Sequence, residues 1–480
     1  MEIDTHEGAN AGAAGQALAV ASVTTAAMIA LMSLPGKALG AGLAAVVGVG
    51  GLIWLSRFVS SHRAWLLGLL VLEELLPYAN VIPYDPQSRW IFRYPILAAL
   101  CIPMVPAAWR SGILLRGNFK AFALYYAWAA ATTIYSLAPA ASVGRLLPAI
   151  LLFVGLSAMI ADISAGVEVR NILLRFLVCC GVILALQMVA AVALPSAMSW
   201  SAEEPGLPPR FSGIFNTPNV LGQLLVVVVG AGAVCWPHVS GWRKATLGGL
   251  IAISAALAAV ADSRSGFVAL GIGGTLYAIW RYRLKGLLAC VAAALVAGAI
   301  WISLSSGARV YLNRGAANLS GRTEAWRFEV HQIERRPLTG YGYDVEGQIF
   351  QDRLFPDWGA YWLRGANTSL HNGYLGIAIG VGIPATLLWL WAFIRPWLSL
   401  FAGDEDPWEL KSMALLVVVP LLTLALVESP LDPIRYPKGL LLCACWMAAE
   451  RFRLLERERA ASVVPTENPL FRTIQLFPTA

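Results

Sequence analysis

The chain has 480 residues, of which 58% are hydrophobic and 13% charged, and its mean hydropathy is +0.66. These values exclude an ordinary soluble globular domain and indicate a protein with many membrane spans. The formal net charge of +7 would suit a nucleic-acid binder. However, the basic residues gather in short loops between apolar stretches, which indicates membrane orientation and predicts no nucleic-acid partner.

Apolar stretches follow one another along the chain, and most approach the roughly 17 to 25 residues that a bilayer-spanning helix needs. They lie at 17–34, 39–56, 64–77, 94–109, 119–137, 144–161, 172–195, 218–236, 244–261, 266–281, 286–304, 373–394, 411–428 and 438–450. Two of them, 64–77 and 438–450, are short, and Glu73 and Glu74 interrupt the first. We therefore predict an all-α polytopic membrane protein with about 12–14 transmembrane helices.

Basic residues indicate which loops face the cytoplasm. They occupy short loops and the C-terminal tail, at Arg57, Arg63, Arg110, Arg116, Arg243, Lys244, Arg281, Arg283, Lys285, Arg451, Arg453, Arg457 and Arg459. By the positive-inside rule these loops and both termini are cytoplasmic, and the intervening loops face outward. The predicted order is a cytoplasmic tail, transmembrane helices, an outer loop, further transmembrane helices and a second cytoplasmic tail, at 1–16, 17–304, 305–370, 371–450 and 451–480.

The outer loop at 305–370 is the one extramembrane segment long enough to fold, and loops of this length are usually functional. Within it, Trp326, Val330 and Ile333 recur at helical spacing. Ser320 is a plausible N-cap, and Pro337 would stop the helix. We predict an amphipathic helix that lies on the membrane surface.

Three outward arginines stand at predicted helix starts. Arg210 precedes the stretch at 218–236, Arg264 lies in the tight turn ADSRSG, and Arg322 falls in the first turn of the amphipathic helix. The helix macrodipole disfavours a cation at such positions unless an anion is bound. The paired donors of arginine fit phosphate oxygens, so we predict a shared pyrophosphate site. The alternative for each arginine is snorkelling towards lipid headgroups.

His371 opens the apolar stretch at 373–394 in the sequence NTSLHNGYL. A helix N-terminus lowers the pKa of an imidazole and keeps it neutral, as a general base requires. The alternative is a capping or packing role, in a segment where Asn367 and Ser369 could also cap the helix. No outward His, Cys or carboxylate cluster has the spacing of metal ligands, and no nucleotide-binding fingerprint occurs, so we predict neither metal nor cofactor.

Five motifs occur in order on the outward side: RFSGIFNTPN at 210–219, ADSRSG at 261–266, GRTEAW at 321–326, RPLTGYGYD at 336–344 and LHNGYL at 370–375. This ordered set resembles the O-antigen ligase family of bacterial envelope enzymes, which also includes polysaccharide polymerases. The resemblance covers roughly residues 205–395.

The resemblance implies a GT-C-type glycosyltransferase of the bacterial inner membrane. Its active site would face the periplasm, its donor would be a glycan on undecaprenyl pyrophosphate, and its acceptor a sugar hydroxyl of lipid A-core or of another glycan. Transfer would be metal-independent and inverting. By motif, His371 matches the family's catalytic histidine, Arg210 and Arg322 its essential arginines, and Arg264 a further basic position.

The predicted mechanism has His371 deprotonate the acceptor hydroxyl while the arginines stabilise the leaving pyrophosphate. Asn219 and Asn372 are expected to orient their neighbours, and Tyr341 and Tyr343 to line a sugar groove. Two alternatives stay open. One is a polymerase of the same family, and the other is a lipid-linked oligosaccharide flippase or transporter. A transporter usually places its ionisable groups near the bilayer midplane, whereas here they gather on one face.

Overall fold

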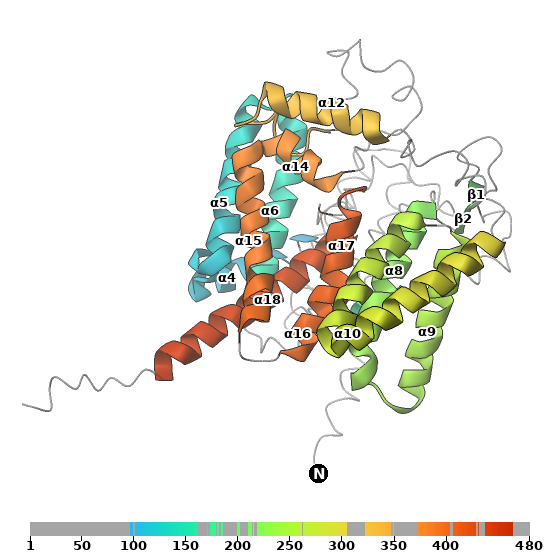
Figure 1. Ribbon diagram of the computed structural model, residues 1–480. Helices are drawn as coiled ribbons and strands as arrows, with labels where there is room; N and C mark the ends of the chain where they lie inside the picture. Colours follow the sequence, from blue (N-terminus) through green and yellow to red (C-terminus); the bar gives the residue numbers. More distant parts are fainter. Residues whose placement is uncertain are drawn as a thin grey trace, which may run out of the picture.

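The computed structural model describes residues 97–463 except for a set of gaps, which include parts of the predicted outer loop. The gaps fall at 99–100, 162–169, 171–172, 179, 182–183, 186–198, 202–209, 214, 216–217, 262, 305–321, 347–348, 350–371, 404–406, 429–430 and 432–436. The predicted spans at 17–34, 39–56 and 64–77 lie outside the described residues, as do Ser320 and His371. The described part is almost entirely helical (Figure 1).

The first described helices are α4 (Val105–Ser111), α5 (Gly117–Thr132) and α6 (Pro139–Ala161), with 3₁₀ turns at Ile102–Met104, Ile113–Leu115 and Thr133–Tyr135. The apolar stretches at 119–137 and 144–161 are therefore helical, as predicted. α4 ends at Gly112, whose left-handed φ of 61° a glycine adopts without strain.

The middle of the chain forms α8 (Pro218–Cys235), α9 (Gly241–Val260) and α10 (Arg264–Leu304). α10 is two helices joined at Arg283, which has a non-helical φ of 56°. This break falls in the basic loop predicted between 266–281 and 286–304. A Cβ on Gly286 would lie 2.1 Å from the carbonyl oxygen of Ala278, so the second helix folds back closely on the first.

The C-terminal part contains the following elements, in chain order: α12 (Arg322–Arg335), α14 (Gly373–Val381), α15 (Ile383–Ala402), α16 (Trp408–Met413), a π-helical turn (Ala414–Val418), α17 (Val419–Leu424) and α18 (Pro437–Val463). The predicted single helix at 373–394 is wrong, because Gly382 divides it into α14 and α15 with a φ of 83°. α18 also continues past 450 into the segment predicted as a tail.

The structure also contains a short antiparallel pair of strands, β1 (Ser199–Ser201) and β2 (Arg210–Gly213), which the all-α prediction missed. Strands of three and four residues are too short to show a period-2 pattern. The pair holds Arg210 opposite Ser201 and packs β2 against α8.

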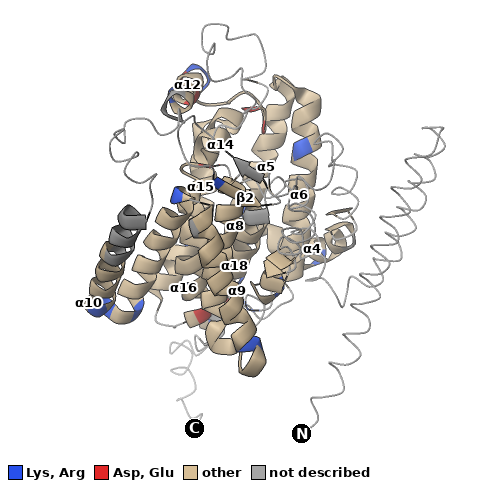
Figure 2. Cartoon of the chain, turned by 90° about the vertical axis from the view of Figure 1, so that its right-hand side faces the viewer, with Lys and Arg blue, Asp and Glu red and all other residues tan. Residues whose placement is uncertain are grey.

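Three described helices are long and apolar enough to cross a membrane: Pro139–Ala161, Pro218–His238 and Ile383–Ala402. The chain is thus a multi-pass membrane protein. The helices run between two ends of the bundle (Figure 1). We call the end that holds the starts of α8, α10 and α14 the site end. Charged residues lie mainly towards the two ends (Figure 2).

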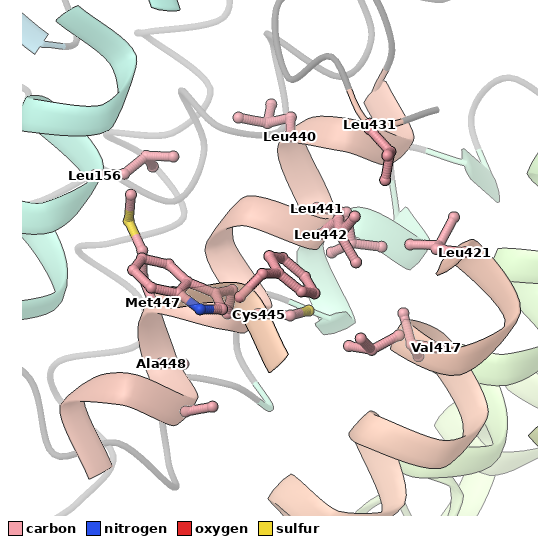
Figure 3. Close-up of a cluster of buried hydrophobic side chains, with 14 of the residues drawn as sticks. Leu156, Val417, Leu421, Leu431, Leu440, Leu441, Leu442, Cys445, Met447 and Ala448 are labelled. Atoms are coloured by element: carbon pink, nitrogen blue, oxygen red, sulfur yellow. The ribbon is translucent and has the colours of Figure 1, made fainter. Parts of the chain in front are cut away.

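A large apolar core joins α5, α6, α15, α17 and α18. Figure 3 shows Leu156 of α6 beside Met447 of α18, whereas Val417 of the π turn and Leu421 of α17 lie on the other side of α18, near Leu442. Aromatic rings fill the neighbouring layer, with Phe122 and Trp446 at 4.3 Å between ring centroids. A second, smaller cluster lies under α12, and its members are Phe328, Ile333, Tyr341, Val345, Ile349, Ala378 and Ile379.

Candidate functional site

Arg210 is buried at the start of β2, with 8% of its surface exposed. Its Nε donates a hydrogen bond to the carbonyl oxygen of Ala261 at 3.1 Å, and its Nη2 donates to Oδ1 of Asn219 at 2.9 Å. The side chain therefore ties the strand to the end of α9 and to the first turn of α8. A buried guanidinium needs such acceptors, because an unpaired buried charge is strongly destabilising.

The Asn219 side chain also contacts a carboxylate. Its Nδ2 lies 3.4 Å from Oε1 of Glu428, which follows α17. The amide thus accepts from a cation and donates towards an anion, an arrangement that fixes which way its side chain points. Asn219 thus contacts both a cation and a carboxylate, and its role of orienting neighbours in the site stays a prediction. The sequence did not single out Glu428 as a site residue.

The start of α14 is attached to the same region. The backbone N–H of Gly373 donates to the carbonyl oxygens of Ala425 and Glu428, at 2.8 and 2.9 Å. Asn372 is the N-cap, since its Oδ1 accepts from the N–H groups of Tyr374 and Leu375, both at 3.0 Å. Its Nδ2 donates to the carbonyl oxygen of Leu426 at 3.1 Å.

His371 lies outside the described residues. The residue that follows it in the chain, Asn372, is hydrogen-bonded to Leu426 after α17. Hydrogen bonds run from Arg210 through Asn219 and Glu428 to Gly373, which brings segments near 210, 219, 372 and 428 together. The role of His371 stays a prediction.

Arg264 is exposed at the first residue of α10. The preceding Ser263 is buried against Gly222 of α8, where a Cβ would lie 2.0 Å from the Ser263 Cβ. This close approach, together with the bond from Arg210 to Ala261, holds the SRSG turn beside the start of α8. Arg264 consequently lies near the buried arginine in the fold.

Arg322 is the first residue of α12, which lies across the site end of the bundle (Figure 1). The predicted amphipathic helix is present and ends two residues before Pro337. Its buried side differs from the prediction, because Val330 is 44% exposed, whereas Phe328 is buried against the second cluster. Packing on α14 and on the following turn decides which side is covered.

The turn RPLTGYGYD is held by backbone contacts on both sides. The N–H groups of Tyr341 and Gly342 donate to the carbonyl oxygens of Ile379 and Gly380, at 2.8 and 2.9 Å. The N–H of Tyr343 donates to Oγ1 of Thr132 at 3.1 Å. Tyr341 is itself buried, and its hydroxyl donates to Gln332 at 3.1 Å. The structure thus gives both tyrosines a packing role, and the predicted sugar-groove role stays a prediction.

An apolar cavity of about 470 Å³ opens beside the start of α14. Its walls come from α12, α14 and α15 and include Val330, Ile333, Tyr374, Leu375, Thr386 and Leu387. Among the described residues no three His, Cys, Asp or Glu side chains lie close enough to hold a metal ion.

The helical bundle, with the buried Arg210 and its hydrogen-bonded partners at one end, defines a multi-pass membrane protein with a polar site at that end. Residues 249–390 match the family model described as O-antigen ligase, so the chain carries an O-antigen ligase domain and is a membrane glycosyltransferase of the O-antigen ligase or polymerase type. The matched stretch contains Arg264, Arg322 and His371, whereas Arg210 and Glu428 lie outside it. No curated protein matches the chain.

Proposed function

We propose that this protein is an O-antigen ligase, which moves a glycan from undecaprenyl pyrophosphate to a sugar hydroxyl of lipid A-core on the periplasmic face of the inner membrane. The observation that carries the proposal is the hydrogen-bonded path from Arg210 through Asn219 and Glu428 to the N-terminus of α14. This path supports the hypothesis that Arg210 and His371, which directly precedes Asn372 in the chain, act at the same site.

In the proposed reaction, His371 takes the proton of the acceptor hydroxyl as its oxygen attacks the anomeric carbon. The new glycosidic bond forms on the face opposite the bond to pyrophosphate, which breaks, so the configuration inverts. Pyrophosphate is a good leaving group and needs little protonation. Its developing negative charge is met by Arg210, Arg264 and Arg322, which act as fixed cations in a partly dry site.

The remaining polar residues orient this machinery. Asn219 fixes the Arg210 guanidinium through its hydrogen bond, and Asn372 caps the start of α14, the helix that follows His371 in the chain. The apolar cavity between α12, α14 and α15 lies close to this cap and suits the hydrocarbon chain of a lipid-linked donor. The donor's pyrophosphate would then lie at the membrane boundary, beside the arginines.

A polymerase of the same family is the second candidate, since the family match covers both activities. The glycans of a deletion strain decide between them. A ligase predicts full-length polymer retained on undecaprenyl pyrophosphate, whereas a polymerase predicts single repeat units. Loss of activity in EDTA with recovery on adding a divalent metal would contradict the metal-independent reaction. Movement of a labelled lipid in proteoliposomes without glycan transfer would favour a flippase.

A further inference from the structure

α6 is one of the helices long and apolar enough to cross the membrane, and it carries a single charged residue, Arg145, in its second turn. An ionisable side chain in a membrane-spanning helix is costly, and it usually has a function and a defined partner. Arg145 lies outside residues 249–390, so the family match does not cover it.

The partner of Arg145 is Asp344, the last residue of the turn RPLTGYGYD. The Nη1 of Arg145 donates a hydrogen bond to the carbonyl oxygen of Asp344, and its Nε lies 3.4 Å from Oδ2 of the Asp344 carboxylate. Asp344 has a φ of 54°, in the left-handed region that residues other than glycine seldom occupy. Such a conformation persists where the surroundings hold the backbone in place. Arg145 contacts both the backbone and the side chain of this residue.

The junction between α5 and α6, residues 132–145, holds the rest of the same turn, and we call it the α5–α6 corner. The Ser142 hydroxyl donates to the carbonyl oxygen of Tyr343 at 2.8 Å, so the hydrogen bond of 2.7 Å between Ser136 and Ser142 is donated by Ser136. A Cβ on Gly342 would lie 2.3 Å from the Ser136 hydroxyl oxygen. The turn therefore approaches the corner as closely as a glycine allows.

The same turn is attached to both helices of the candidate site. It follows α12 directly, and α12 begins at Arg322. Backbone hydrogen bonds join it to the last residues of α14, the helix that Asn372 caps. Trp128 of α5 adds a direct contact, since its Nε1 donates to the carbonyl oxygen of Val381 at 2.9 Å. A shift of the turn on the α5–α6 corner would therefore displace α12 and α14.

We propose that Arg145 is a positioning residue, and that its contact with Asp344 fixes the turn after α12 and thereby the placement of α12 and α14 against α6. An arginine suits this task, because its planar guanidinium presents several donors in a fixed geometry. The effect on glycan transfer rests on the proposed function, whereas the docking of the turn does not.

The contact should matter more for placement than for stability. The side chains of Arg145 and Asp344 are 30% and 12% exposed, and an ion pair that solvent reaches contributes little to stability. The apolar clusters on both sides of the turn stay in place without it. A misplacement of about 1 Å, in contrast, can slow an enzyme by about 10²-fold. Loss of the contact should therefore lower kcat and leave Tm close to that of the wild type.

Arg145→Gln and Asp344→Asn test this in the full-length protein in nanodiscs. Asparagine has nearly the same shape as aspartate and tolerates a positive φ, so it removes only the charge. Each variant should lower kcat for glycan transfer by about 10- to 100-fold, with little change in donor KM or in Tm. The double variant should lose no more than the larger of the two single losses, because both substitutions break the same contact.

Two further variants complete the kinetic test. Arg116→Gln is the matched control, since it breaks the ion pair of Arg116 with Glu458 at the opposite end of the bundle and should leave kcat unchanged. Arg145→Lys keeps the charge and should transfer faster than Arg145→Gln. Normal kcat in both Arg145→Gln and Asp344→Asn overturns the positioning role, and losses that multiply in the double variant overturn the pairing.

Amide hydrogen exchange tests the docking without any substrate. Exchange in residues 339–344 and in α12 should be faster in Arg145→Gln than in the wild type, whereas exchange in α9 should be equal in both. Unchanged exchange in the turn and in α12 overturns the docking. If the wild type transfers no glycan at all, the proposed function fails, and the exchange comparison by itself still decides whether Arg145 holds the turn.

Discussion

At the residue scale, the candidate site consists of side chains that are individually ordinary and that become informative through their partners. Arg210 is buried between a backbone carbonyl and Asn219, and Asn219 in turn approaches Glu428. A guanidinium presents fixed paired donors, so its position is defined by geometry as well as by charge. Losing either property should therefore impair the protein.

Replacing His371 by alanine should lower turnover by about 10²- to 10⁴-fold, the usual effect of losing a general base. The measurement is glycan transfer by purified protein with a lipid-linked donor. His331→Ala is the control, because 44% of the His331 side chain is exposed on α12 and this residue is not part of the proposed site. Near-normal transfer by His371→Ala would exclude the base role.

Arg210→Lys should also reduce transfer, because lysine keeps the charge but cannot contact Ala261 and Asn219 together. We expect a loss of roughly 10-fold or more in kcat/KM, equivalent to about 1.4 kcal/mol. The same substitution at Arg322 should have a similar effect. Arg243→Lys, at the opposite end of the bundle, should leave kcat/KM unchanged, and an equal loss there would point to general destabilisation.

At the scale of elements, the division between α14 and α15 shows how a glycine shapes the site end. Gly382 has a φ of 83°, and a Cβ there would lie 2.4 Å from the carbonyl oxygen of Leu338. The N–H of Ile383 also donates to the carbonyl oxygen of Pro337 at 2.7 Å. The junction between α14 and α15 is thus hydrogen-bonded to the turn that follows α12.

Gly382→Ala should destabilise the protein by about 1–3 kcal/mol from backbone strain, with a further loss from the steric clash. Thermal unfolding in detergent measures this as a lower Tm. Gly112→Ala is the matched control, because Gly112 also has a positive φ but no atom lies within 4 Å of its Cβ position. Equal losses at both positions would mean that strain alone accounts for the effect.

At the scale of the whole molecule, successive helices run in opposite directions between two ends of the bundle, and these ends carry different polar and charged residues. Arg210, Asn219, Asn372 and Glu428 meet at the site end. The opposite end holds ion pairs such as Arg116 with Glu458 at 3.0 Å and His238 with Glu409 at 3.2 Å. The basic loops at 243–244 and 281–285 lie at that opposite end as well, since they join helices that start or end there.

The positive-inside rule therefore predicts that the site end faces the periplasm. A fluorescent protein fused after residue 480 should be bright, and alkaline phosphatase inserted in the loop at 305–321 should be active. A reporter inserted at 404–406 should behave as a cytoplasmic one. The reverse pattern would place the candidate site on the cytoplasmic side and would exclude a lipid-linked donor on the periplasmic side.

The sequence by itself determined the properties that depend on composition and local order. Its apolar stretches identified a helical membrane protein, and its basic loops predicted which ends of the helices face the cytoplasm. The spacing of apolar residues after Ser320 indicated the amphipathic helix. The ordered motifs led to the glycosyltransferase family. Each of these signals is local, so it can be detected without knowing what packs against it.

Only the tertiary structure decided the contacts between distant segments. It joined Arg210 to Asn219 and, through Asn219, to Glu428, buried Tyr341 and Glu329, and broke the helix at Gly382. None of these follows from spacing, because each depends on the direction in which a side chain points once helices far apart in the chain have packed. Burial then changes the chemistry of a residue such as Glu329, which reads in the sequence as one more solvated charge on α12.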